Sequence, residues 1–294
     1  MTLHTQTPPP LAAAPDRLVA GGWMVPTGAP GLAGLTAKFE TAVAGVVALM
    51  TGADPEGSPG PTWYPPVVPR AQVERAEYTE GFPHLLGVVH ALPRGSGAAD
   101  CADPAPTERT LTDAVLSPSA CFSIYPQLAD RVLDRTHRFD IAGHIYRHEA
   151  TSEPGRLRCF RQREFVLIGG EQEAVQFRDA WIARFEKLFE VMGLAVSVQV
   201  ANDPFFGPGA RWLRSSQVQQ RLKYEFVLPV YGADPGTAVG SANCHKDHLG
   251  QRFAIGWAPG GTAHSSCAAF GLERVVLALI HAHGDRMEDW PALG

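Results

Sequence analysis

The sequence lacks the features that mark membrane and secreted proteins. No run of about twenty apolar residues occurs, so no segment is expected to span a membrane. The N-terminus has no basic start followed by an apolar run, which argues against a secretory signal. The five cysteines are an odd number without close pairs, and this favours a reducing cytoplasm over a disulfide framework. We therefore expect a cytoplasmic protein with no membrane partner.

A surplus of basic residues is also missing. The chain has 25 Lys and Arg against 30 Asp and Glu, a formal net charge of -5. Binding to a phosphate backbone normally needs an excess of basic side chains on one face, so a nucleic acid such as tRNA is not an expected partner. With 45% hydrophobic residues, the composition predicts a proline-containing flexible lead over residues 1–20 and a single domain over 21–294.

Helical and strand-like segments alternate along the chain. Helices are predicted at Leu35–Met50, Pro126–Phe139, Glu173–Met192, Arg211–Lys223 and from about Ala268, and a surface loop at Pro93–Pro106. After a long hairpin, strands are predicted at "LAVSVQVAND", "YEFVLPV", "AVGSANC" and "RFAIGWA". Strands that follow one another in this way, interrupted by helices, predict an α+β fold with an antiparallel sheet.

The predicted hairpin at Ile145–Gly169, "IYRHEATSEPGRLRCFRQREFVLIG", is unusually rich in charge. Alternate side chains of a strand share a face, so Arg147 and Glu149 point the same way, as do Arg161 and Arg163. Such a face suits a polyphosphate. The alternative is a solvent-facing ribbon whose cross-strand charge pairs contribute a few tenths of a kcal/mol each.

A distant segment, "FGLERVVLALI", adds Arg274 near the start of an apolar helix. The series "YRHE", "FRQREF" and "GLER" resembles motifs two and three of class II aminoacyl-tRNA synthetases. The segments "WYPPVVP", "GFPHLLGVVHAL", "ANDPFFG" and "QQRLKYEFVLPV" extend this likeness. Between about Trp63 and His283 the chain resembles the amino acid:[carrier protein] ligases, truncated relatives of the methanogen-type seryl-tRNA synthetase.

The resemblance implies a six-stranded antiparallel sheet flanked by helices. It also implies a reaction in which ATP activates a small amino acid, with glycine or alanine favoured, to an aminoacyl-adenylate. The aminoacyl group then passes to the phosphopantetheine thiol of a carrier protein. A homodimer formed near "WYPPVVP" is a further implication.

The same resemblance implies the ATP contacts, which fall on Arg147, Glu149, Arg161, Phe165, Glu225 and Arg274. Arg147 would hold the α-phosphate and the amino-acid carboxylate, and Arg274 the γ-phosphate. Arg161 would supply a further phosphate contact. Glu149 would lie on the adenine side, where Phe165 would stack on the base, and Glu225 on the side of Mg²⁺. This chemistry needs positioning and charge stabilisation.

A catalytic zinc ion is implied at Cys121, Glu164 and Cys267. Three protein ligands leave an open position for the substrate's amino group. The alternative is that the cysteines are small buried apolar residues. Asp203, in "ANDPFFG", matches an acidic residue that contacts the amino group; the alternative is a turn-forming Asp before proline.

The predicted helix Arg211–Lys223 has no clear apolar stripe. In the resembled family an extra helix at this place docks the acidic carrier protein, and Arg211, Arg214 and Arg221 would supply the complementary charge. The alternative is an ordinary exposed helix.

Two other functions stay open: a minimal synthetase-like enzyme that charges tRNA or another acceptor, and a noncatalytic protein that binds an amino acid. The presence of Arg147, Glu149 and Arg274 disfavours the second, since a binder has no chemical need for phosphate-binding arginines.

Overall fold

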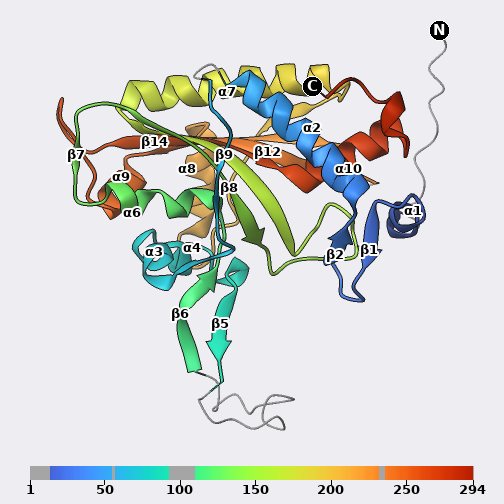
Figure 1. Ribbon diagram of the computed structural model, residues 1–294. Helices are drawn as coiled ribbons and strands as arrows, with labels where there is room; N and C mark the ends of the chain where they lie inside the picture. Colours follow the sequence, from blue (N-terminus) through green and yellow to red (C-terminus); the bar gives the residue numbers. More distant parts are fainter. Residues whose placement is uncertain (1–13, 55–56, 93–109, 232–235, 294) are drawn as a thin grey trace.

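The computed structural model describes residues 14–54, 57–92, 110–231 and 236–293. A seven-stranded sheet forms its centre, in the order β10-β11-β12-β14-β9-β8-β3 (Figure 1). These strands are β3 (Thr62–Tyr64), β8 (His137–Tyr146), β9 (Cys159–Gly169), β10 (Ser197–Val200), β11 (Lys223–Leu228), β12 (Thr237–Lys246) and β14 (His264–Gly271). All neighbours pair antiparallel except β3, which pairs parallel with β8 at the edge. The predicted α+β class is confirmed, with one short edge strand added to the expected six.

Three long helices cover one face of this sheet: α2 (Ala37–Ala53), α7 (Glu171–Val191) and α10 (Leu272–His283) (Figure 1). The aromatic side chains of α7 pack directly on the sheet. Phe185 stacks on Phe226 of β11 and Phe270 of β14, with ring centroids 4.1 and 4.0 Å apart. Burial of such large apolar side chains is the main stabilising contribution available to the fold. Because this face is filled, a ligand must approach the sheet from the other side.

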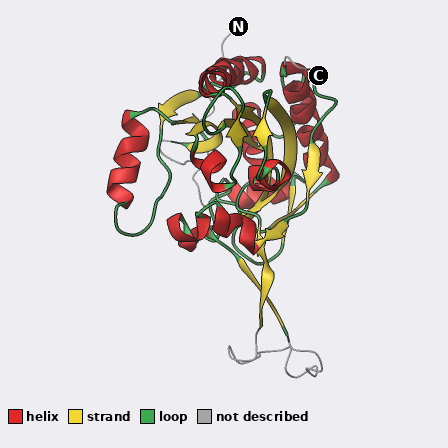
Figure 2. Cartoon of the chain, turned by 90° about the vertical axis from the view of Figure 1, so that its left-hand side faces the viewer, coloured by secondary structure: helices red, strands yellow, loops and turns green. Residues whose placement is uncertain are grey.

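Short helices surround the opposite face. They are α3 (Arg70–Arg75), α4 (Tyr78–Gly81), α6 (Tyr125–Leu128), α8 (Ala210–Gln219), α9 (His248–Arg252), η2 (Pro83–Leu85) and η4 (Ala120–Ser123). Figure 2 shows α8 at the left edge, standing away from the sheet at the end of two loops.

The remaining elements lie at the margins. Strands β4 (Val67–Pro69), β5 (Val88–Ala91) and β6 (Thr110–Leu116) form a small sheet that projects from the body (Figure 1). The others are α1 (Ala14–Ala20), β1 (Met24–Pro26), β2 (Ala33–Leu35), β7 (Val132–Leu133), β13 (Gly256–Trp257) and η5 (Met287–Asp289). Within the described residues, no helix is both long and apolar enough to cross a membrane.

Several predicted elements were wrong. The helix expected at Pro126–Phe139 ends at Leu128, and Asp130, with φ of 60°, turns the chain toward β7 and β8. The strand expected at Arg252–Ala258 is divided between α9 and β13, whereas the small residues of 264–271 form β14 and delay the last helix to Leu272.

The N-terminal lead was predicted over residues 1–20. Residues 1–13 lie outside the described residues, but Ala14–Ala20 form α1, with Ala14 and Leu18 buried. Helix α1 thus occupies part of the range for which a flexible lead was predicted. The loop expected at Pro93–Pro106 lies outside the described residues, and the single domain over 21–294 stays a prediction.

Candidate active site

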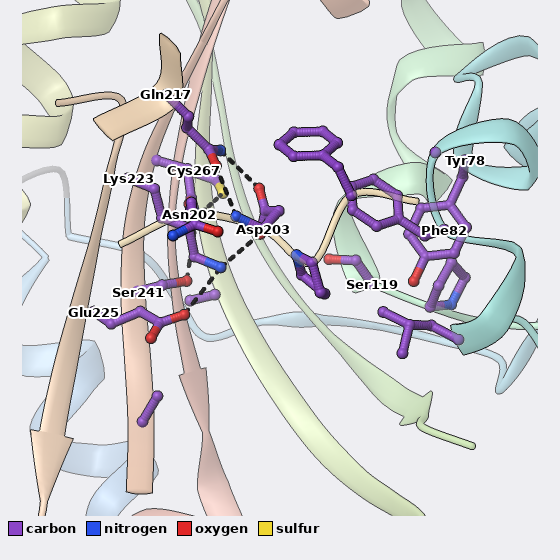
Figure 3. Close-up of a pocket in the computed structure, with 18 of the residues that line it drawn as sticks. Tyr78, Phe82, Ser119, Asn202, Asp203, Gln217, Lys223, Glu225, Ser241 and Cys267 are labelled. Atoms are coloured by element: carbon purple, nitrogen blue, oxygen red, sulfur yellow. Dashed lines mark hydrogen bonds and ion pairs between the residues drawn. The ribbon is translucent and has the colours of Figure 1, made fainter. Parts of the chain in front are cut away.

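A cavity of about 1120 Å³ opens on the sheet face that the long helices leave free. Its floor comes from β9, β11, β12 and β14, and its walls from α4, η4 and the connection between β10 and α8. Figure 3 shows a polar cluster around Asp203 on one side and Tyr78 and Phe82 on the other. The predicted site residues that line the cavity are Cys121, Arg147, Glu149, Glu164, Asp203, Glu225, Cys267 and Arg274.

Neutral backbone oxygens hold the two principal arginines of the cavity. Arg147 donates from its Nη1 to the carbonyls of Pro118 and Tyr146, at 2.6 and 2.8 Å. Arg274 donates to the carbonyls of Gly155 and Ala238, both at 3.0 Å. A carbonyl fixes a guanidinium without cancelling its charge. Both arginines are therefore oriented and still able to attract an anion.

The positive charges in the cavity act on one another. Burial, together with the charges of Arg147 and Arg156, lowers the pKa of Arg274 to about 10, against the opposite effect of Glu149 and Glu225. A ligand with several negative charges relieves this repulsion. Arg156, which the sequence left without a role, lines the same cavity, where its Nε lies 3.8 Å from Glu153.

Arg161 does not belong to this site, and its predicted phosphate contact is corrected. Its Nε lies 2.6 Å from Glu273 of α10, and its NH1 lies 2.6 Å from Glu40 of α2. These carboxylates neutralise the guanidinium on the face of β9 that the long helices cover. Arg161 joins two helices to the sheet and leaves no charge for a ligand.

Phe165 also faces the helices, so its predicted stacking on adenine is corrected. The side chain is 3% exposed and stacks on Trp181 of α7 with centroids 4.1 Å apart. The aromatic side chain of β9 that lines the cavity is Phe160, and the Arg274 guanidinium lies 4.5 Å above its ring centroid. Strand alternation explains why Phe160 lines the cavity and Phe165 does not: Phe160 and Glu164 lie on one face of β9, and Phe165 lies on the other.

The three predicted zinc ligands meet at the bottom of the cavity. Glu164 Oε2 accepts the Cys121 N–H at 2.8 Å and the Ser119 hydroxyl at 3.2 Å, and both thiols hydrogen-bond to the same carboxylate. Burial, and then the charge of Glu164, raises the pKa of both thiols well above the ordinary value. Burial also raises the pKa of Glu164.

The three side chains of this cluster suit a metal ion in their donor atoms more than in their present arrangement. Among the described residues, no group of three or more His, Cys, Asp or Glu side chains is arranged to hold a metal ion. The donor set nevertheless suits zinc, since two thiolates and a carboxylate are ordinary zinc ligands. Glu164 is 1% exposed, and none of the ion pairs in the described part of the chain involves it. A buried carboxylate without a cation is the environment that a metal would complete.

Asp203 lies on the connection between β10 and α8, beside the cavity. Its carboxylate pairs with Lys223 of β11 at 2.6 Å, and Lys223 also pairs with Glu225 at 3.0 Å. Burial acts to raise the pKa of Asp203, but the charge and hydrogen bond of Lys223, with a bond from Gln217, outweigh it and leave the pKa below its ordinary value. Sequence reasoning missed both Lys223 and Gln217, for which no motif gave a signal.

The three predicted docking arginines lie outside the cavity, on or just after α8. Arg211 and Arg221 are exposed, whereas Arg214 is half-buried and donates to the Phe205 carbonyl at 2.8 Å. The same helix exposes 70% of Trp212. A projecting helix with exposed basic and apolar side chains has the composition of a protein-binding surface.

The chain was compared with known proteins. No protein-family model matches it. It is 37% identical to "Amino acid--[acyl-carrier-protein] ligase 1" of Bradyrhizobium diazoefficiens over 90% of this chain and 84% of that protein. It is 30% identical to "Type-2 serine--tRNA ligase" of Methanopyrus kandleri over 60% of this chain but only 36% of that protein.

Among solved structures, the fold resembles the M. kandleri SerRS in its complex with A. aeolicus tRNASec, with a TM-score of 0.80 and 20% sequence identity. The match covers 99% of this chain and 60% of the synthetase chain. The shared part is thus the fold described above, and the larger synthetase contains further structure.

Proposed function

We propose a function for this chain, which belongs to the amino acid–[acyl-carrier-protein] ligase family. The chain activates an amino acid with ATP and transfers it to the phosphopantetheine thiol of a carrier protein. The observation that carries this proposal is the set of three cavity arginines, Arg147, Arg156 and Arg274. Two of them are held by neutral carbonyls, and the charges of Arg147 and Arg156 help to lower the pKa of Arg274. A triphosphate matches that arrangement.

In the first step the amino-acid carboxylate attacks the α-phosphorus of ATP. A carboxyl oxygen–phosphorus bond forms, and the bond from the α-phosphorus to the bridging oxygen breaks, so that pyrophosphate leaves. Arg147 contacts the α-phosphate and the carboxylate, while Arg156 and Arg274 contact the outer phosphates. Arginines placed in this way stabilise charge that moves toward the leaving group.

Adenine lies against Phe160, and Glu149 accepts a hydrogen bond from it at the mouth of the cavity. The Phe160 ring already supports the Arg274 guanidinium, so base and phosphate contacts are built on one side chain. Glu225 lies on the side where Mg²⁺ accompanies the outer phosphates, because hard cations prefer carboxylate oxygens.

In the second step the carrier's thiol attacks the carbonyl carbon of the adenylate. A carbon–sulfur bond forms, AMP leaves with the carboxyl oxygen, and the thiol proton passes to water. Arg147 holds the phosphate of the departing AMP. The docking surface on α8, with Arg211, Arg214 and Arg221, supports the carrier as acceptor because a basic helix complements an acidic partner.

Zinc is part of the proposal, with Cys121, Glu164 and Cys267 as its ligands. When bound, the metal supplies an open coordination position for the unprotonated amino group of the substrate. Metal analysis of the purified protein should find about one zinc per chain, and Cys121→Ser or Cys267→Ser should lose it. Full zinc content in both variants would refute this ligand set.

Glycine or alanine is the proposed amino acid, a preference that rests on the family resemblance. Pyrophosphate exchange with a panel of amino acids tests it directly. The highest kcat/KM for one of these two is expected, and a higher value for serine or a larger amino acid would overturn the preference.

Exchange of pyrophosphate into ATP, dependent on an amino acid, tests the activation step. Arg274→Ala and Cys267→Ala should each lose it. Undiminished exchange in both would overturn the site. Arg161→Ala is the matched control, because Arg161 faces the helices; its exchange should fall only with the fraction of unfolded protein.

The acceptor separates this function from its rivals. A phosphopantetheinylated carrier protein and bulk tRNA, offered together with labelled amino acid, should yield label on the carrier. Label on tRNA alone would favour a minimal synthetase, and no exchange at all would favour a noncatalytic binder. A cytoplasmic homodimer remains part of the proposal, and sedimentation of the purified chain tests its dimeric state.

A further inference from the structure

Helix α8 lines the cavity with Leu213, Ser216 and Gln217, and Gln217 is the one that holds a predicted site residue. Gln217 makes two hydrogen bonds with Asp203, which precedes the helix on the chain (Figure 3). The Asp203 N–H donates to Gln217 Oε1 at 2.7 Å, and Gln217 Nε2 donates to Asp203 Oδ2 at 2.8 Å. One amide group thus fixes both the backbone and the carboxylate of the same residue.

The other carboxylate oxygen of Asp203 is held from the sheet. Asp203 Oδ1 accepts from Lys223 Nζ at 2.6 Å, and Lys223 is held in turn by Glu225. A carboxylate has about four lone-pair sites, so two partners leave sites free. With one oxygen fixed by the helix and the other by the sheet, the carboxylate cannot rotate, and its free lone pairs keep a constant direction at the cavity edge.

We propose that Gln217 is a positioning residue of the amino-acid site, which holds Asp203 so that its free lone pairs accept the amino group of the substrate. The inference rests on the proposed function and deepens it. Without Gln217, the carboxylate is held by Lys223 alone and can turn about its terminal torsion. The amino-acid site therefore includes a residue of the helix that carries the exposed arginines.

The test uses pyrophosphate exchange without any carrier, so that docking plays no part. Gln217→Met keeps the length of the side chain but neither donates nor accepts, and Gln217→Glu puts a second anion beside Asp203. Loss of a hydrogen bond to a charged group predicts a KM for the amino acid about tenfold higher in Gln217→Met, with a larger rise in Gln217→Glu. The KM for ATP should stay within about twofold. Gln219→Ala, an exposed position on the same helix, is the control and should match the parent.

The outcomes distinguish a failure of the inference about Gln217 from a failure of the proposed function. Exchange in the parent with an unchanged amino-acid KM in both variants refutes the inference and leaves the proposed function intact. An equal rise in the KM for ATP also refutes it, because that pattern indicates general damage to the cavity. Absence of exchange in the parent refutes the proposed function, and the inference with it. Thermal unfolding of each variant confirms that the chain is folded.

Discussion

Two aromatic side chains of β9 have different roles. Phe160 lines the cavity, whereas Phe165 packs on Trp181 in the core. Phe160→Leu should raise the KM for ATP about tenfold, since stacking of a base on an aromatic ring contributes about 1–3 kcal/mol. Phe165→Ala should instead lower the free energy of unfolding by about 3–5 kcal/mol through the cavity it leaves. Exchange kinetics and chemical denaturation measure the two effects.

The opposite result would support the sequence-based prediction that adenine stacks on Phe165. A tenfold higher KM for ATP in a folded Phe165→Leu protein, with a normal KM in Phe160→Leu, would place adenine on the other face. Because leucine preserves most of the apolar volume at either position, both variants are expected to fold.

The acidity of Asp203 gives a pH prediction. Lys223→Met removes the cation that holds its pKa low, and the burial that remains raises that pKa. A protonated carboxyl accepts weakly from the substrate's amino group, so the variant's KM for the amino acid should rise more steeply than the parent's between pH 7 and 5. Three other groups face Asp203. Glu225 loses its own ion-pair partner, Lys223, in the variant. Burial lowers the pKa of His245 to about 4 and raises the pKa of Tyr78, so both side chains stay neutral in this range. Parallel profiles for the parent and the variant would contradict the prediction.

The sequence predicted which residues contribute to the cavity, but only in part which face of the sheet each side chain occupies. The motifs identified Arg147, Glu164 and Arg274 as cavity residues, and the structure brings them together. The assignment of Phe165 to the same cavity as Glu164 conflicts with strand alternation, which was available from the sequence. Arg156 lies in a loop, where no periodicity indicates direction.

At the scale of elements, the exposed arginines on and just after α8 are expected to act in transfer and not in activation. Charge reversal at both, Arg211→Glu with Arg221→Glu, should raise the KM for the carrier about tenfold and weaken the salt dependence of transfer. Pyrophosphate exchange should not change, because neither side chain lines the cavity. Arg286→Glu is a control with a 70% exposed side chain near the C-terminus. Unchanged transfer in the double variant would move the carrier to another surface.

Elements were hardest to predict where burial is complete. Strand β14 is buried on both faces almost throughout, and its Ser, Cys and Ala residues show no alternation that distinguishes a strand from a helix. The hairpin of β8 and β9 was predictable because its strands are long and enclose a loop with Pro154 and Gly155. The false helix at Pro126–Phe139 had suitable periodicity, but the positive φ of Asp130 and the pairing of β8 with β9 override it.

At the scale of the whole molecule, the two apolar clusters share strands. Phe165 and Leu167 belong to the cluster under the long helices, and Val166 and Ile168 to the cluster on the cavity side. Neither cluster can lose its structure while β9 stays paired. We therefore predict a single cooperative unfolding transition, with equal calorimetric and van't Hoff enthalpies. Two separated transitions would contradict the single domain predicted over residues 21–294.

The carbonyl-held arginines would also bind the product of the proposed activation step. A cluster of cations fixed for a triphosphate would keep most of its contacts with pyrophosphate. Pyrophosphate would therefore compete with ATP and, as it accumulates, return the adenylate to ATP. In a cell, net charging of the acceptor would depend on the enzyme that hydrolyses inorganic pyrophosphate as much as on this chain.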